Sequence, residues 1–236
     1  MNSRQISIVS MILALLTGIW IICMVLLMQQ HGTIMATFED AIDFVRDPGG
    51  LFYLTYLNVV VLTIFDVVLF GLLYLYFRQA YPALSLVGIL FVPVYAAYNL
   101  FVYISQISVV QMIISDHDGV ISEEVMQVLL GQFIQLWEHS TIGFLNNYAY
   151  AILGIPSILF GIAIYRMKPG AEGRNGAGIS GLNRVTGILL ILNAMACFLG
   201  VAGIITGNHV LANGSAAGGG LFFLSLVGMG IIFWKI

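Results

Sequence analysis

Residues 51–77 read LFYLTYLNVVVLTIFDVVLFGLLYLYF, an apolar run with one charged residue, Asp66. A helix needs about 20 apolar residues to cross the hydrocarbon core of a bilayer, and this run is long enough. Only a backbone whose hydrogen bonds are satisfied internally is stable there. The run therefore predicts a transmembrane helix, and we read the rest of the chain as part of a membrane protein.

Five further apolar segments have the same character. The chain has 236 residues, of which 60% are apolar and only 8% are charged, a balance that soluble domains do not show. The sequence predicts an all-α fold, a polytopic membrane helix bundle forming one integral membrane domain over residues 1–236. Its six transmembrane helices are expected at residues 6–28, 51–77, 83–114, 142–165, 185–205 and 216–234.

One predicted span and one connection between spans differ from the rest in length or composition. The run 83–114 is longer than one crossing needs and contains Pro93, so we expect it to tilt, to kink near Pro93 or to project beyond the bilayer. Residues 166–184 are rich in glycine and carry five charges, a composition typical of a flexible linker. We expect a flexible inner loop there.

The basic residues define the orientation of the chain. In the six-span arrangement seven of them fall on one side and only Arg46 falls on the other. Basic residues accumulate on the cytoplasmic side of membrane proteins, so both termini are expected to be cytoplasmic in a multi-pass protein of the plasma membrane. The seven are Arg4, Arg78, Arg166, Lys168, Arg174, Arg184 and Lys235.

The two long outer connections have helical apolar spacing. Residues 33–46 and 122–137 each predict a short amphipathic helix, the second with Ser122 as its N-cap. These helices either cover the outer mouth of the bundle or rest on lipid. We expect their apolar side chains to turn away from water, in particular Phe38, Ile42, Val128, Leu129 and Phe133.

Asp66 is the only acidic or basic residue inside a predicted span. A charge is costly there and no Lys or Arg lies at a comparable depth, so a proton, a bound cation or hydrogen-bond donors must neutralise it. It is either a protonated structural acid or part of a transport or ligand site. The candidate neighbours are Asn99, Tyr95, Tyr98, Asn193 and the pair Asn146-Asn147.

A second group of polar residues lies in the outer loops and offers oxygen and imidazole ligands for a metal ion. None of its members shows the i, i+4 spacing of a helical metal site, and solvation explains such residues equally well. The group comprises Asp116, His117, Asp118, Glu138 and His139. We expect no cofactor and no catalytic residue, because no Ser, Cys or Thr in a span has a histidine base near it.

The last span is rich in glycine. Small residues allow transmembrane helices to approach closely, so these glycines should face neighbouring helices or a second copy of the chain. They are Gly214, Gly218, Gly219, Gly220, Gly228 and Gly230.

Three features point to a family resemblance. They are Ser3-Arg4 before the first span, the Asp66 helix running into Leu75-Tyr76-Phe77-Arg78, and a third span that bears proline and tyrosine. With these features the chain resembles an uncharacterised family of small bacterial six-span integral membrane proteins. The resemblance implies the same architecture and a bacterial inner membrane, and it assigns no functional residue.

Three classes of function are compatible with these observations. The first is a non-enzymatic membrane protein that binds a small apolar ligand or lipid, or serves as an accessory subunit in a homo-oligomer or with a membrane partner. The second is a proton- or cation-coupled small-molecule transporter that uses Asp66, and the third is an intramembrane enzyme. Nucleic-acid binding is excluded as a main function, because 8 basic against 11 acidic residues leave no large basic surface.

Overall fold

A computed structural model describes residues 3–31, 37–115, 122–137, 139–167 and 176–236. Every regular element in these ranges is a helix, which confirms the all-α prediction. Six of the helical segments are long and apolar enough to cross a membrane. The long helices are α1 (Ser3–His31), α3 (Gly50–Phe77), α4 (Pro82–Ile107), α7 (Thr141–Tyr165), α8 (Gly176–Thr206) and α10 (Gly214–Lys235).

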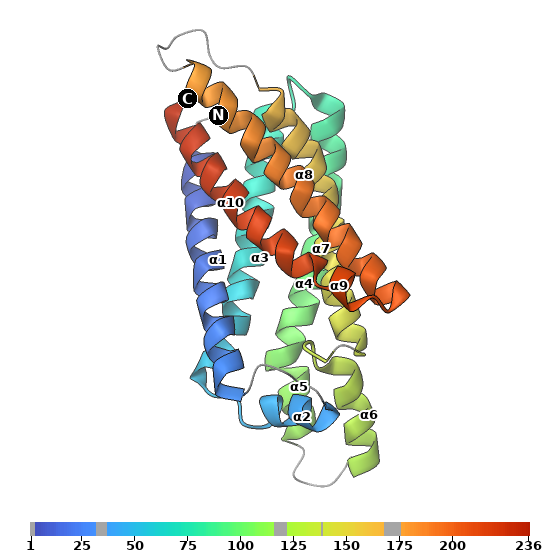
Figure 1. Cartoon of the computed structure of the whole chain (residues 1–236). Coiled ribbons are helices and arrows are strands. Elements are labelled where there is room, and N and C mark those ends of the chain that lie inside the picture. The colour runs from blue at the N-terminus through green and yellow to red at the C-terminus, as the bar shows by residue number, and fades with distance from the viewer. Residues whose placement is uncertain (1–2, 32–36, 116–121, 138, 168–175) are drawn as a thin grey trace.

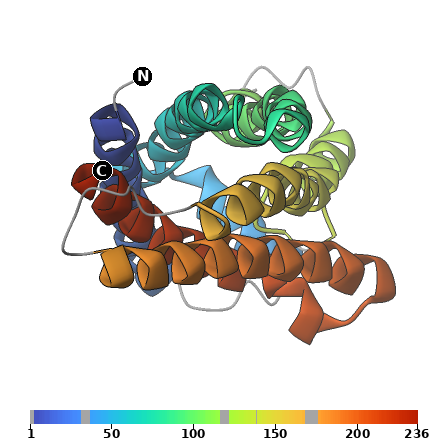
Figure 2. The same ribbon diagram turned by 90° about the horizontal axis from the view of Figure 1, so that it is seen from above.

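The long helices form a closed ring. Each contacts two neighbours, in the order α1, α3, α4, α7, α8 and α10, and α10 packs against α1 to complete the circuit. Figure 2 shows this arrangement along the helix axes. Residues that face the middle of the ring are therefore enclosed by protein, and the opposite faces of the helices form the outer surface.

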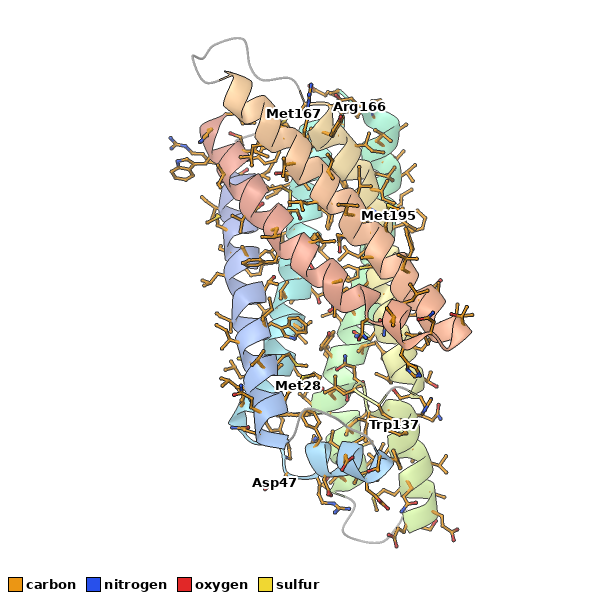
Figure 3. The ribbon with its side chains drawn as sticks, in the orientation of Figure 1. Met28, Asp47, Trp137, Arg166, Met167 and Met195 are labelled. Carbon is orange, nitrogen blue, oxygen red and sulfur yellow. The ribbon has the colours of Figure 1, made fainter. Side chains whose placement is uncertain are left out.

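The two ends of the ring differ. Both termini lie at one end, which we call the terminal end, and Arg166 and Met167 are labelled there (Figures 1 and 3). The other end carries three short helices, α2 (Phe38–Arg46), α5 (Val109–Ile114) and α6 (Glu123–Phe133), which we call the cap. Met28, Asp47 and Trp137 are labelled at this cap end (Figure 3). A short helix, α9 (His209–Ala212), connects α8 to α10.

The cap contains two short helices where the sequence predicts amphipathic helices, but the second ends at Phe133 and residues 134–137 are not helical. Thr37 caps α2, because its hydroxyl oxygen accepts a hydrogen bond from the Asp40 amide at 3.2 Å and its own amide donates to the Asp40 carboxylate at 2.8 Å. The Ser122 hydroxyl oxygen caps α6. Residues 33–36, also assigned to the first helix, lie outside the described residues.

Four of the five cap side chains that should turn away from water are buried or half-buried within the protein. Ile42 is buried, and Phe38, Leu129 and Phe133 are half-buried, but the side chain of Val128 is 67% exposed. Val128 is exposed because α6 packs against the protein along one narrow face, on which Leu130 is the buried residue. Val128 lies two residues away, about 200° around the helix, and so points in the opposite direction.

The predicted loop 166–184 is too long. Residues 176–184 belong to α8, and residues 168–175 lie outside the described residues. The glycines in this segment suggested a linker, but lengthening an existing helix costs far less than nucleating a new one. The apolar helix that follows therefore continues back to Gly176.

The third span is interrupted at Ser108, where α4 ends and α5 begins, and helix α4 continues through Pro93. The backbone of Ser108 has φ −123° and ψ −73°, outside the helical range, and its hydroxyl donates to the Ile104 carbonyl at 2.7 Å. The excess length of this span is therefore used in the cap.

Glycines of α10 lie at helix contacts, as predicted for four of the six. A Cβ atom at Gly218 would meet Cys197 of α8, and one at Gly230 would meet Met11 of α1. Gly214 and Gly228 also face α8. Gly219 and Gly220 have open space around the Cβ position and face no neighbouring helix of this chain, so for them a contact with a second copy stays a prediction.

Candidate functional site

Asp66 lies inside the ring, on the buried face of α3. Its side chain is 1% exposed, and one carboxylate oxygen, Oδ2, accepts a hydrogen bond from the Tyr95 hydroxyl of α4 at 2.8 Å. Thr63 precedes Asp66 by three residues and Asn99 follows Tyr95 by four, so each pair shares one helix face. The contact between α3 and α4 brings these four side chains together.

The four residues form one hydrogen-bonded group. The Asn99 amide nitrogen donates to Thr63 Oγ1 at 2.6 Å and to the Tyr95 hydroxyl oxygen at 3.4 Å. Thr63 in turn donates to the Val59 carbonyl at 2.8 Å. The donors of this group are thus all engaged, which orients Tyr95 toward Asp66.

Two acceptors in this group have no partner among the described residues. They are Asp66 Oδ1 and Asn99 Oδ1, both buried. An unsatisfied buried acceptor costs about 1–3 kcal/mol, so each oxygen favours any proton or cation that reaches it. No basic residue of the chain falls inside a span at the depth of Asp66 to supply a counter-charge.

Further tyrosines extend this group toward the cap end. Tyr150 of α7 lies against Tyr95, with ring centroids 6.4 Å apart, and its hydroxyl is 3.0 Å from that of Tyr103. Tyr103 also lies against Tyr56 of α3, with ring centroids 5.9 Å apart. Tyr56 then donates to Gln135 Oε1 at 3.2 Å, in the connection between α6 and α7.

A buried glutamine holds this connection in place. Gln106 of α4 donates to the Phe133 carbonyl at 2.8 Å and accepts from the Gln135 amide at 3.0 Å through its Oε1. On the other side of the cap, Gln111 donates to the Val45 carbonyl at 3.2 Å and so attaches α5 to α2. The cap is therefore bonded directly to the helix that carries Tyr95.

Of the seven residues that the sequence suggested for this site, the structure brings Asp66, Tyr95 and Asn99 together. Tyr98 lies on another face of α4, where its ring meets Tyr148 edge to face at 5.7 Å. Asn193 belongs to a separate polar group in which it donates to Ser157 at 3.3 Å.

The residues that sequence reasoning missed are Thr63, Tyr103, Tyr150, Tyr56, Gln106 and Gln135. One signal could have found part of this set. Tyr95, Asn99 and Tyr103 recur every four residues, and this spacing places them on one stripe of a helix.

The structure tests the outer metal candidates only in part. Asp116, His117, Asp118 and Glu138 lie outside the described residues, and His139 is exposed with its ring 5.3 Å from that of Trp137. Within the described part of the chain, no three His, Cys, Asp or Glu residues are grouped closely enough to hold a metal ion.

An open apolar groove lies on the outer surface of the ring. It has a volume of about 410 Å³ and is lined by residues of α4, α7 and α8. None of its lining residues belongs to the hydrogen-bonded group around Asp66, so the groove is distinct from that group. Among its lining residues are Phe91, Val94, Ile155, Phe198, Ala202 and Ile205.

Comparison with known proteins gives no relative for this chain. It matches no protein-family model, no curated protein and no solved structure.

Proposed function

We propose that this protein is a proton- or cation-coupled transporter in which Asp66 binds and releases the coupling ion. The observation that carries the proposal is the carboxyl group of Asp66, buried inside the ring with one oxygen bonded to Tyr95 and the other without a partner among the described residues. Ionisable residues inside membrane spans commonly serve ion or substrate pathways.

The alternative is a protonated acid that only joins two helices. Such an acid is most stable when both of its oxygens are hydrogen-bonded, since an unpaired buried acceptor is costly. Asp66 Oδ1 and the nearby Asn99 Oδ1 both lack a hydrogen-bond partner among the described residues. A proton on Asp66, or a small cation held by these oxygens, would offset the cost, and carboxylate and amide oxygens suit hard cations.

Infrared spectroscopy of the purified protein in lipid nanodiscs tests the proposal. The carbonyl band of a protonated carboxylic acid should be present in the wild type, absent in Asp66→Asn, and unchanged in the control Asp43→Asn. Asp43 is exposed and forms a salt bridge with Arg46 at 3.2 Å. In the wild type, raising the pH should remove the band if the coupling ion is a proton, and adding Na⁺ at constant pH should remove it if the ion is a metal cation.

The proposal would be overturned by a band that neither pH nor Na⁺ changes while the protein stays folded. An Asp66 that is permanently protonated would be structural. Asp66→Asn should fold in either case, because a neutral amide can replace a neutral acid as a hydrogen-bonding group.

We further infer a bacterial inner membrane, which the resemblance to small six-span proteins implies. Both termini lie in the cytoplasm in this proposal, because the basic residues gather at the terminal end. A chain with Arg174→Cys and without Cys23 and Cys197 tests this orientation. An impermeant thiol reagent should label position 174 only after the membrane is opened. Labelling of intact cells would reverse the orientation.

The apolar groove favours a second function, the binding of a lipid chain by a non-enzymatic membrane protein. Ala202→Trp would fill the groove, whereas Gly71→Trp would add the same bulk to α3, where a Cβ atom meets open space. Native mass spectrometry should then show a bound lipid in the wild type and in Gly71→Trp but not in Ala202→Trp. Equal lipid binding by all three proteins would exclude this function.

A further inference from the structure

We propose that the coupling ion is a proton and that it reaches Asp66 only from the cap end, through a column of polar side chains, while packed aromatic rings separate Asp66 from the terminal end. This inference rests on the proposed function and deepens it, since it names the ion and the side of the membrane that supplies it. We call these side chains the polar column: Asp66, Tyr95, Asn99, Tyr150, Tyr103, Tyr56 and Gln135.

The buried face of α3 changes character at Asp66. Toward the cap end it carries four residues with polar groups, Thr55, Tyr56, Asn58 and Thr63. Toward the terminal end its buried residues are all apolar, namely Leu69, Phe70, Leu73 and Phe77. Asp66 therefore lies at the boundary between a polar and an apolar half of the helix face.

The apolar half is the shorter of the two. From Asp66 to the last residue of α3 is about 17 Å, and to its first residue about 24 Å, at the helical rise per residue. If a proton reached Asp66 from water by the shortest path, it would enter from the terminal end. The buried polar groups of α3 instead follow the longer route.

Aromatic rings close the short route. Phe70 of α3 lies against Phe160 of α7, with ring centroids 5.6 Å apart, and both side chains are almost completely buried. Phe160 also covers Gly88 of α4, where an added Cβ would be only 2.8 Å from the ring. Nearer the terminal end, Phe77 and Phe233 continue the packing. These rings offer a proton neither donor nor acceptor.

The long route consists of hydroxyl and amide groups. It begins at Gln135, which is partly exposed at the cap, and passes through Tyr56, Tyr103 and Tyr150 to Tyr95. Some neighbours along it are in ring contact rather than hydrogen-bonded, and a water molecule commonly bridges such groups. The final link, from the Tyr95 hydroxyl to Asp66 Oδ2, is already formed at 2.8 Å.

Uptake through this column conserves every proton. The hydroxyl proton of Tyr95 moves to the ionised Asp66 carboxylate, and the Tyr95 oxygen takes a proton from the next hydroxyl of the column. Each tyrosine donates one proton and accepts one, so it ends with the proton count it began with. Tyr56 takes its proton from water at the cap end, because Gln135 Oε1 only accepts the Tyr56 hydrogen bond and has no proton to give. The net change is one proton removed from water at the cap end and one carboxylate neutralised.

The proton is favoured over a metal cation by the packing of the column. Tyr95, Asn99, Tyr103 and Tyr56 are all at most 3% exposed, so the column is closed to bulk water. A metal cation would need continuous space and ligands to replace its water at every step. A proton needs only hydroxyl groups that can both donate and accept.

The test is the infrared carboxyl band of Asp66 in sealed vesicles, with the protein sorted by orientation through a thiol at position 174. A rapid pH jump applied at the cap end should change the band promptly, and the same jump at the terminal end should change it only as fast as the membrane leaks. Adding Na⁺ at constant pH should have no effect.

Tyr103→Phe tests the column itself, because it removes the hydroxyl that meets Tyr150 and keeps the ring. The response to a cap-side jump should slow by about tenfold or more, which corresponds to about 1.4 kcal/mol of barrier. Tyr150→Phe removes the same hydrogen bond from its other side and replaces Tyr103→Phe if that variant is unstable. Tyr76→Phe is the matched control, since Tyr76 packs among Phe77 and Phe233 outside the column.

Three results would overturn the inference. They are a prompt response from the terminal end, an unchanged rate in both tyrosine variants, or removal of the band by Na⁺ at constant pH. In each of these cases Asp66 still exchanges an ion and the proposed function survives. A band that nothing changes would instead refute the proposed function itself.

Discussion

Replacing Gly218 by leucine should destabilise the helix bundle, because this glycine is where α10 crosses α8. A Cβ atom at Gly218 would lie 2.6 Å from Cys197 Sγ and 3.1 Å from the Asn193 carbonyl oxygen. Favourable contacts between non-bonded heavy atoms begin near 3.5 Å, so α10 would have to move by about 1 Å. Leucine adds three more carbon atoms to that contact.

The expected loss of stability is at least about 1–3 kcal/mol, the range for overpacked interiors. Gly220→Leu is the matched control, since it makes the same change two residues away, where the Cβ meets open space. Leucine also has a higher helix propensity than glycine by roughly 0.5–1 kcal/mol, so Gly220→Leu should be as stable as the wild type or more stable. The assay is thermal loss of helical circular dichroism in one detergent.

A double mutant makes the test specific. Gly218→Ala should also destabilise the protein, and Cys197→Ala should recover part of that loss by removing the sulfur atom that the new Cβ meets. The reasoning would be refuted if Gly218→Leu melted like the wild type, or if Gly220→Leu lost as much stability as Gly218→Leu.

Three further changes have expected outcomes. Tyr95→Phe removes the donor to Asp66 Oδ2 and should cost about 1–3 kcal/mol in denaturant unfolding, with no loss expected for the surface change Tyr53→Phe. Gln106→Leu removes the bonds to Phe133 and Gln135, so hydrogen exchange should accelerate in residues 133–137 and stay unchanged in α8. Gly187→Ala would place a Cβ 2.6 Å from the Gly161 carbonyl oxygen and should lower the melting temperature, whereas Gly181→Ala, at an open position of the same helix, should not.

The number and order of the spans could be predicted because membrane insertion depends on local composition. A run of about 20 apolar residues must be helical whatever surrounds it, so no tertiary information was needed. The ends of the helices depend on more than composition. Gly176 begins α8 within a segment that looked like a linker, and Ser108 ends α4 inside the uncharged run 83–114.

Within the candidate site, the sequence alone could identify Asp66 but could not decide which residues contact it. Asp66 is conspicuous, because a carboxyl group in an apolar run requires a partner. The choice among possible partners depends on helix rotation and on the pairing of α3 with α4, and neither is encoded in local spacing. Tyr95 and Tyr98 differ by less than one turn, yet Tyr95 reaches Asp66 and Tyr98 lies against Tyr148.

Helices α4 and α7 connect the proposed ion site at Asp66 to the aromatic barrier, by which we mean the packed rings on its terminal side, Phe70, Phe160, Phe77 and Phe233. Helix α4 carries Tyr103 and Gly88, and α7 carries their respective partners, Tyr150 and Phe160. A displacement of α7 away from α4 would therefore break the polar column on the cap side of Asp66 and separate the aromatic barrier on its terminal side. A coupled transporter requires this relation, because its ion site must close to one side of the membrane as it opens to the other. The same two helices line the apolar groove on the outer surface, so lipid that occupies the groove would act on the same motion.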